Sequence, residues 1–130
     1  MIGTNEDLET FLSRLERAPQ RLGDGTYAIS MGAGRPHVAV RLAPPVLVVQ
    51  VAIGPAPKAP ERSGPLFRKL LELNAQRLLH AAYGLENDTI VLAAALELAN
   101  LDVNELEAVL ADVDMALAEQ VPELRAMAQG

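Results

Sequence analysis

The sequence predicts an α+β domain of two layers, in which helices pack on an antiparallel sheet. Apolar residues recur with the period of a helix in three segments. Five other segments have the character of strands, and in two of them apolar residues alternate along the chain. The connections between successive strands are too short for the crossovers that parallel strands require, which favours an antiparallel meander. At 130 residues the chain has the length of one domain, so we expect residues 1–130 to form a single unit.

The first helix is expected over residues 5–18. Thr4 and Asp7 have the spacing of a capping box at its start, and Pro19 ends it. Its apolar residues share one face because they recur at intervals of three and four: Leu8, Phe11, Leu12 and Leu15.

Three strands are expected next, over residues 27–31, 38–42 and 46–53. The Asp24-Gly25 turn signal precedes the first, and Pro44-Pro45 separates the second from the third. The third strand is apolar on both faces, which indicates a central position in the sheet or an outer face covered by another element.

A loop and a second helix are expected in the middle of the chain. Residues 54–65 hold four prolines and two glycines, a composition typical of a surface loop without regular structure. The helix predicted over 66–79 has an unusually wide apolar surface, more than one face of a small sheet would cover.

The last third of the chain predicts a strand over 80–85, a turn at 86–88 and a strand over 89–98. Asp102 and Glu105 have capping-box spacing and open a final helix, which Pro122 ends or kinks. The predicted order of elements is therefore α-β-β-β-α-β-β-α.

Composition and charge exclude several classes of protein. The chain has no cysteine, which excludes disulfides and thiolate metal sites. Residues 97–130 hold eight acidic side chains and one basic one, a segment that repels phosphate and argues against nucleic acid as the partner. We find no secretory signal and no apolar run long enough to span a membrane, so a cytoplasmic protein is expected.

No catalytic or metal-binding pattern stands out. His37 and His80 lie far apart on different strands, without ligand residues at the spacing that a metal site uses. Carboxylates two positions apart on a helix, such as Asp112 and Asp114, point in different directions and cannot share a proton, so we assign them to a solvated acidic face. The sequence therefore predicts a protein that is not an enzyme, with no cofactor and no metal.

Asn74 lies in the middle of the wide second helix and allows two interpretations. It is a solvent-facing residue, or it lies at a seam where two helices pair and a single polar residue fixes the register. The second helix and the third strand expose more apolar surface than one core covers. We therefore expect a homodimer.

Three stretches resemble the class I chaperones of type III secretion, the CesT-like or Tir-chaperone family, together with the related YbjN-like regulators. They are Leu70-Leu71-Glu72-Leu73-Asn74, residues 83–92 from Tyr83 to Leu92, and Leu101-Asp102 leading to Leu106 and Leu110. The order of elements and the acidic character agree with this resemblance, which covers the chain from the first helix to about Val121.

The resemblance implies a dimer that holds an extended, unstructured N-terminal segment of a secreted effector protein, without catalysis, nucleic acid or membrane. Carried onto this chain, it implies a partner-binding groove at Leu8, Phe11, Leu12, Leu15, Val38, Val40, Val46 and Val48. It implies a dimer contact at Phe67, Leu71, Asn74, Leu78 and Tyr83.

Two alternatives stay open at this point. The chain could belong to the YbjN-like branch of sensory or regulatory proteins, or it could bind a small molecule in a pocket between helix and sheet. Such a pocket needs convergent polar groups, and the apolar faces of this sequence carry almost none.

Overall fold

The computed structural model confirms an α+β fold, built on one six-stranded antiparallel sheet. It describes residues 2–15, 17, 19–23 and 25–129. The strands pair in the order β1-β2-β3-β4-β6-β5, which makes β1 and β5 the two edges. Their bounds are Gln20–Gly23 for β1, Thr26–Ile29 for β2, Val38–Ala43 for β3, Val46–Pro55 for β4, Ala82–Glu86 for β5 and Thr89–Glu97 for β6.

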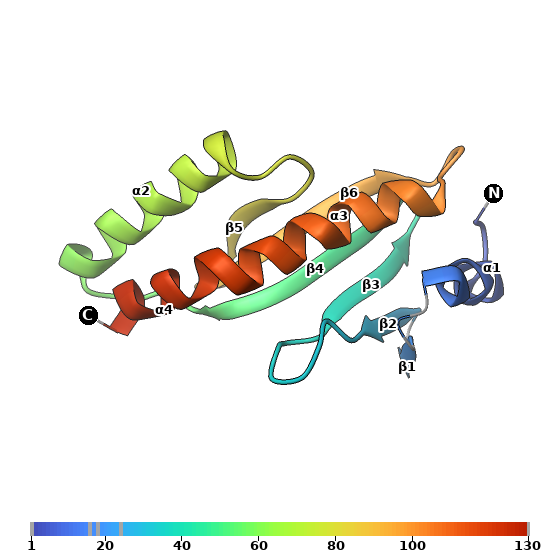
Figure 1. Ribbon diagram of the computed structural model, residues 1–130, viewed down its shortest axis with the longest axis horizontal. Helices are drawn as coiled ribbons and strands as arrows, with labels where there is room; N and C mark the ends of the chain where they lie inside the picture. The colour runs from blue at the N-terminus through green and yellow to red at the C-terminus, as the bar shows by residue number, and fades with distance from the viewer. Residues whose placement is uncertain (1, 16, 18, 24, 130) are drawn as a thin grey trace.

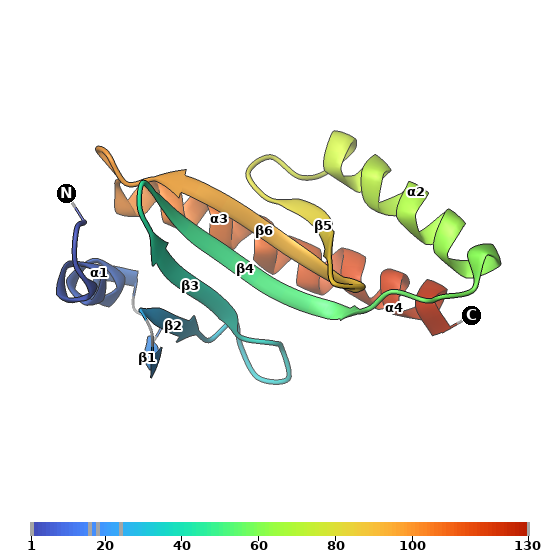
Figure 2. The same cartoon turned by 180° about the vertical axis from the view of Figure 1, so that it is seen from behind.

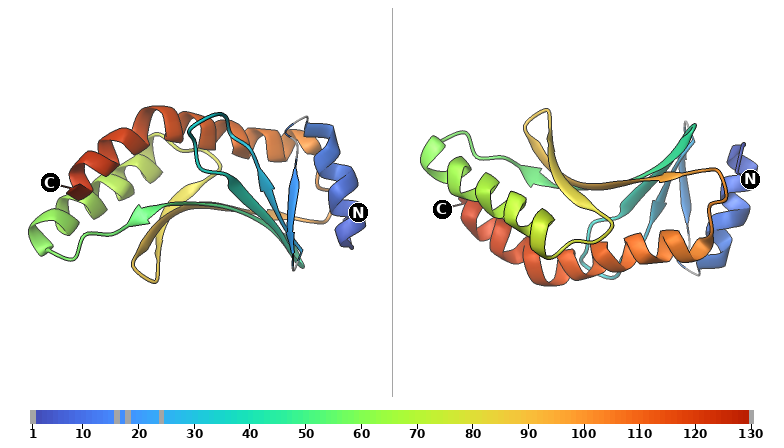
Figure 3. Two further views of the ribbon diagram at one scale, coloured as in Figure 1. Left: turned by 90° about the horizontal axis from the view of Figure 1, so that it is seen from below. Right: turned by 90° about the horizontal axis from the view of Figure 1, so that it is seen from above.

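The helices lie on one side of the sheet and at its ends. They are α1 (Asn5–Leu12) with the 3₁₀ turn η1 (Ser13–Leu15), α2 (Pro60–Gln76), α3 (Val103–Met115), the π-helical turn η2 (Ala116–Gln120) and α4 (Val121–Gln129). α3, η2 and α4 form one long rod along the sheet, with α2 beside β5 at one end and α1 at the other (Figure 1, Figure 2). Both views of Figure 3 show α2, α3 and α4 on the same side of the sheet.

The core lies between the sheet and this layer of helices. Along β4 every second residue is buried, namely Leu47, Val49, Val51 and Ile53, and these belong to one core cluster with the buried residues of α3, namely Leu106, Val109, Leu110 and Val113. β4 pairs with β3 and β6, which confirms that the third predicted strand is central. Its outer face, from Val46 to Ala52, is only half-buried or exposed, and none of the described helices covers it.

The N-terminal part of the sheet differs from the prediction. The first helix ends at Leu12 and a 3₁₀ turn follows to Leu15, while residues 16 and 18 of the predicted helix lie outside the described residues. The strand β1 was not predicted. β1 has four exposed residues and a register shift near Gly23, so it shows no alternation that could reveal a strand. The observed order therefore has one strand more than α-β-β-β-α-β-β-α.

The predicted loop over 54–65 is wrong at both ends. β4 continues to Pro55, and α2 begins at Pro60, six residues earlier than expected. Proline is well suited to the first turn of a helix, where the missing N–H has no partner in any case. Pro65 lies inside the helix and removes one hydrogen bond, which the buried residues Leu66, Leu70 and Leu73 of the same helix offset by packing.

Two other predictions about turns had different outcomes. The turn at 86–88 is confirmed: Asn87 and Asp88 have φ values of 48° and 64°, as the tight connection of the β5–β6 hairpin requires. Pro122 does not end the last helix. The turn η2 precedes it, and the helix continues as α4 to Gln129.

Candidate polypeptide-binding surface

A side chain of α2 closes the edge strand β5. The Asn74 carboxamide accepts a hydrogen bond from the Tyr83 N–H at 2.7 Å and donates one to the Tyr83 carbonyl at 3.1 Å. These are the two backbone groups that an added strand would use at this position. Asn74 is half-buried and not solvent-facing, so the first interpretation of this residue is wrong. A role at a helix-pairing seam stays a prediction.

A carboxylate of α3 binds the backbone just before β5. Oδ2 of Asp112 accepts hydrogen bonds from the N–H groups of Leu79 at 3.0 Å, His80 at 2.6 Å and Ala81 at 3.0 Å. The Asp112 side chain is buried, so the prediction that it belongs to a solvated acidic face is wrong. A carboxylate can be buried when backbone donors satisfy its oxygens, and the sequence spacing of this contact gives no sign of it.

Asp114, two positions further on, does lie near the surface. It forms ion pairs with Arg17 at 3.3 Å and with Arg35 at 3.7 Å. Both arginines precede α2 in the chain, Arg35 in the connection between β2 and β3. Asp114 therefore links the N-terminal half of the sheet to α3, in an ion pair that solvent screens.

The hydroxyl group of Tyr83 makes a third connection to the helix layer. It donates a hydrogen bond to Oε1 of Gln120 in η2 at 2.7 Å, and both side chains are buried. Burial raises the pKa of the Tyr83 hydroxyl well above its usual range, so the hydroxyl stays protonated and remains a donor. β5 is thereby bound to α2, α3 and η2 together.

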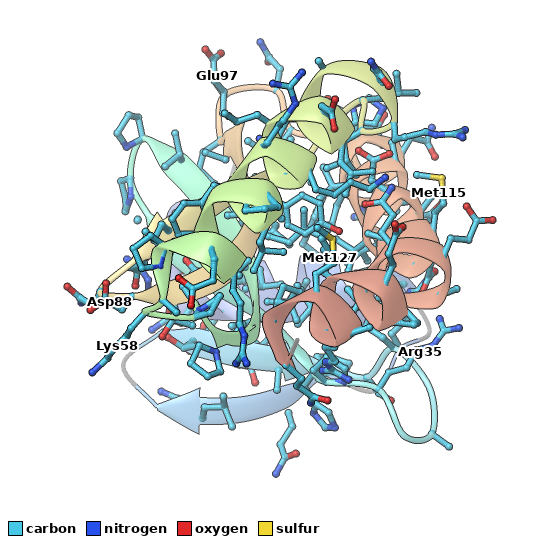
Figure 4. All side chains as sticks on the ribbon, turned by 90° about the vertical axis from the view of Figure 1, so that its left-hand side faces the viewer. Arg35, Lys58, Asp88, Glu97, Met115 and Met127 are labelled. Carbon is cyan, nitrogen blue, oxygen red and sulfur yellow. The ribbon has the colours of Figure 1, made fainter. Side chains whose placement is uncertain are left out.

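α2 itself is held against α4. Figure 4, viewed from the end at which α2 lies, shows the two helices side by side with Met127 between them. An ion pair of 3.7 Å between Lys69 and Glu123 joins the two helices at the surface. The cover over the β5 edge is therefore part of the packed structure.

The opposite edge, β1, is open. Its four residues are all exposed, and β1 pairs with β2 alone. Within the described ranges, no hydrogen bond from another segment reaches its free side. Leu22 on this strand is 60% exposed. The sequence offered one weak signal for it, the Asp24-Gly25 turn directly after Pro19 to Gly23, which is where a hairpin would form.

Two hollows lie between α1 and the end of the sheet, and both include Ile2. One of about 450 Å³ is lined by Gly3, Pro44, Pro45, Val46, Glu97, Leu98 and Ala99. The other, of about 250 Å³, is lined by Asp7, Thr10, Phe11, Arg14 and Leu101. The larger hollow has mainly apolar walls, which suits aliphatic side chains of a polypeptide, whereas Asp7, Thr10 and Arg14 give the smaller one a more polar lining.

The structure separates the eight residues of the predicted groove into two groups. Leu8, Leu12, Leu15, Val38 and Val40 are buried in the chain's own core. Phe11 and Val46 line the two hollows, and Val48 lies half-buried on the uncovered face of β4. The predicted binding role of all eight stays a prediction. In this structure a partner can reach Val46 and Val48, whereas Phe11 is buried like the first group.

The five residues of the predicted dimer contact are close together in space but differ in exposure. Leu78 and Tyr83 are buried, and Asn74 is bonded to β5. Phe67 is half-buried, whereas Leu71 is 68% exposed. Leu71 is therefore the residue of this set that is most available to a second copy of the chain.

The described residues contain no group of three His, Asp or Glu side chains that could hold a metal ion. His37 and His80 are both exposed. Among the helices that the structure describes, none is long and apolar enough to cross a membrane.

The fold of this chain has relatives among known proteins. A family model described as CesT_Tir_1 matches residues 1–130. The chain therefore belongs to this family, the type III secretion chaperone family that the sequence resembles. A comparison with curated proteins finds no match.

Solved structures with this fold include secretion chaperone complexes and a regulator. A chain in the heterodimeric ExoU–SpcU complex from the type III secretion system of Pseudomonas aeruginosa matches with a TM-score of 0.70 and 18% identity, covering 88% of this chain and 95% of that one. YbjN from E. coli matches with a TM-score of 0.63 and 14% identity, covering 92% and 95%.

The Yersinia pestis type III secretion chaperone SycH, in complex with a stable fragment of YscM2, matches with a TM-score of 0.60 and 18% identity, covering 93% of this chain and 99% of that one. At these identities the structural matches establish the fold, and they contain both branches that the sequence left open.

Proposed function

We propose that this chain is a chaperone that holds an extended segment of a secreted effector protein for type III secretion. Family membership over residues 1–130 is the observation that carries this proposal. The matched structures of SycH with a fragment of YscM2 and of ExoU with SpcU support it, because each is a complex from that system. The chain acts by binding and not by catalysis, and it needs no cofactor for this role.

The open edge and the two hollows offer the two kinds of contact that an extended polypeptide needs. Main-chain groups of the partner would pair with the free side of β1, whose Leu22 side chain is exposed. Side chains of the partner would enter the two hollows, the aliphatic ones beside Val46 in the larger. The buried leucines of α1 support this surface from beneath.

A homodimer is the second part of the proposal. Leu71 on α2 is 68% exposed and Leu79 just beyond it is 85% exposed, and the half-buried Phe67 lies one turn before Leu71. Large apolar side chains gathered on one helix are typical of an interface. A second copy that packs on α2 would cover them.

The function is tested by purifying the tagged chain from its native cell, identifying the polypeptide that remains bound and mapping the bound segment by its protection from limited proteolysis. We expect an extended segment with spaced aliphatic residues. Raising salt to about 0.5 M should weaken binding only slightly, because salt screens exposed charges far more than buried apolar contacts.

Two matched substitutions locate the contact. Leu22→Asp places a charge on the open edge β1, and Leu85→Asp places the same charge on β5, where the leucine is 52% exposed. We expect capture to be lost in the first variant and kept in the second. Equal loss in both variants, or binding of a folded protein that salt abolishes, contradicts the proposal.

Binding of a small molecule in a pocket between helix and sheet is the second candidate. A hollow of about 310 Å³ between the end of β4 and α4 favours it, since Ile53, Ile90 and Leu124 give it apolar walls and Arg125 adds a cation. A thermal-shift screen with small carboxylic acids, repeated on Arg125→Ala, tests this candidate. A shift that disappears in the variant supports it, and no shift contradicts it.

A further inference from the structure

We infer that Asn74 and Asp112 close the β5 edge of the sheet to strand addition, so that a polypeptide strand is admitted at β1 and not at β5. This inference rests on the proposed function. Beyond that function, it specifies which of the two edges of the sheet accepts the partner and which side chains close the other edge.

The geometry at Tyr83 carries the inference. In an antiparallel sheet, alternate residues of an edge strand direct both the N–H and the C=O away from the sheet. In β5 these are Tyr83 and Leu85, and Ala81 just before the strand has the same orientation. The Asn74 carboxamide is planar like a peptide unit, and it binds both groups of Tyr83 at 2.7 Å and 3.1 Å. It occupies them as a neighbouring strand would.

Asp112 closes the next position along the same edge. Its Oδ2 atom takes the Ala81 N–H at 3.0 Å, together with the two N–H groups that precede it in the chain. Of the three outward positions on this edge, only Leu85 is left without a side-chain partner among the described contacts. One position cannot hold a strand, because pairing needs several hydrogen bonds in register.

The packing of α2 keeps Asn74 in place against β5. Leu70 and Leu73, which both precede Asn74 in the helix, are buried in the core and hold the helix against β5. Natural sheets protect edges by covering them with a helix, and here the helix also satisfies the covered backbone groups. Among the described residues, β1 has neither protection, and the strand is four residues long.

The chain has no cysteine, which allows a direct test with a thiol at each edge. Leu22→Cys and Leu85→Cys replace exposed leucines on β1 and β5. The probe is a synthetic peptide of alternating threonine and valine residues whose own cysteine is activated as a mixed disulfide with thionitrobenzoate. Capture is followed by release of thionitrobenzoate and by the mass of the adduct, relative to a short activated thiol without the strand sequence.

With Asn74 in place we expect the peptide to react preferentially at Leu22→Cys. Adding Asn74→Leu should raise capture at Leu85→Cys about tenfold, the ratio expected from freeing one or two backbone hydrogen bonds. Gln76→Leu, at an exposed position of the same helix, is the control and should leave capture at Leu85→Cys unchanged.

Equal capture at the two edges while Asn74 is present overturns the inference, as does the absence of any gain with Asn74→Leu. Where the leucine variant does not fold, Asn74→Asp serves instead, because it keeps the acceptor for Tyr83 N–H and removes the donor to Tyr83 C=O; it should give a smaller gain, and no gain overturns the inference. Failure of capture at Leu22→Cys alone counts against the proposed strand addition at β1, and a gain at Leu85→Cys in the same experiment still supports the closure of β5.

Discussion

The two edges of the sheet differ in whether side chains occupy their outward backbone groups. β5 is bound to three parts of the helix layer through Asn74, Asp112 and the Tyr83 hydroxyl, whereas β1 pairs with β2 alone and exposes all four of its residues. Both edges carry an exposed leucine, so apolar surface alone does not distinguish them. The difference lies in the backbone hydrogen bonds.

This contrast shows how a small domain can offer one edge of its sheet to a partner while the other edge is protected from pairing with unrelated chains. An open edge is a template for any extended chain, and an edge saturated by side chains is not. Each closing contact is buried or half-buried, where an unsatisfied polar group is costly. The β5 end should therefore be the more rigid and the more sensitive to substitution.

The largest expected effect concerns the proposed dimer at the closed end. Leu71→Asp places a charge in the proposed interface, and burial of an unpaired charge costs enough to shift the dimer toward monomer. Light scattering with gel filtration should change from a mass near twice 13.9 kDa to a mass near 13.9 kDa. Leu22→Asp, the same change at the open edge, should leave the mass unchanged. A concentration-independent monomer before any substitution contradicts the dimer.

Asp112 should be the most sensitive polar residue of the chain. Asp112→Ala removes the acceptor of three backbone N–H groups, one of them buried, and we expect a loss of about 2 to 3 kcal/mol in the free energy of unfolding. Asp114→Ala breaks only part-exposed ion pairs and should cost about 1 kcal/mol or less. Urea unfolding of both variants measures the difference, and equal losses would mean that the buried contact has no special weight.

Replacing each of the two tyrosines by phenylalanine compares the β5 end of the sheet with the β1 end. Tyr83→Phe leaves the buried Gln120 oxygen without its donor at 2.7 Å, and should lower the free energy of unfolding by about 1 to 2 kcal/mol. Tyr27→Phe removes a contact of 3.5 Å to the Asn5 carbonyl, at the limit of a hydrogen bond, and should cost less than about 0.5 kcal/mol. Thermal unfolding should show a larger loss of stability in Tyr83→Phe than in Tyr27→Phe. The reverse order would mean that the hydrogen bond at the open end contributes more to stability.

The smallest expected effect is a pH dependence at α1. The Gly3 backbone N–H and the Thr4 hydroxyl lower the pKa of Asp7, which forms the capping box. A lowered pKa in the folded state stabilises the fold above the ordinary value of about 3.9, and this contribution is lost as pH falls through the folded pKa. The difference in melting temperature between neutral and acidic pH should therefore be slightly smaller in Asp7→Asn. An unchanged difference would mean that the cap does not contribute to stability.

Local signals in the sequence predicted much of the fold because their causes are local. The capping boxes at Thr4 and Asp102, the apolar run of β4 and the turn at Asn87-Asp88 each depend on residues within a few positions of one another. β1 escaped prediction since four exposed residues carry no alternation, and α2 began early because the prolines fitted its first turn.

The sequence by itself determined the fold class and the absence of thiol chemistry, and it left two alternatives for β4, of which the structure shows the central position. The tertiary structure alone decided which edge of the sheet is open. That choice depends on Asn74 meeting Tyr83 from another element and on Asp112 reaching backbone groups that lie more than thirty residues earlier in the chain. Neither contact has a sequence pattern, because a hydrogen bond between a side chain and a distant backbone group exists only once packing has brought the two together.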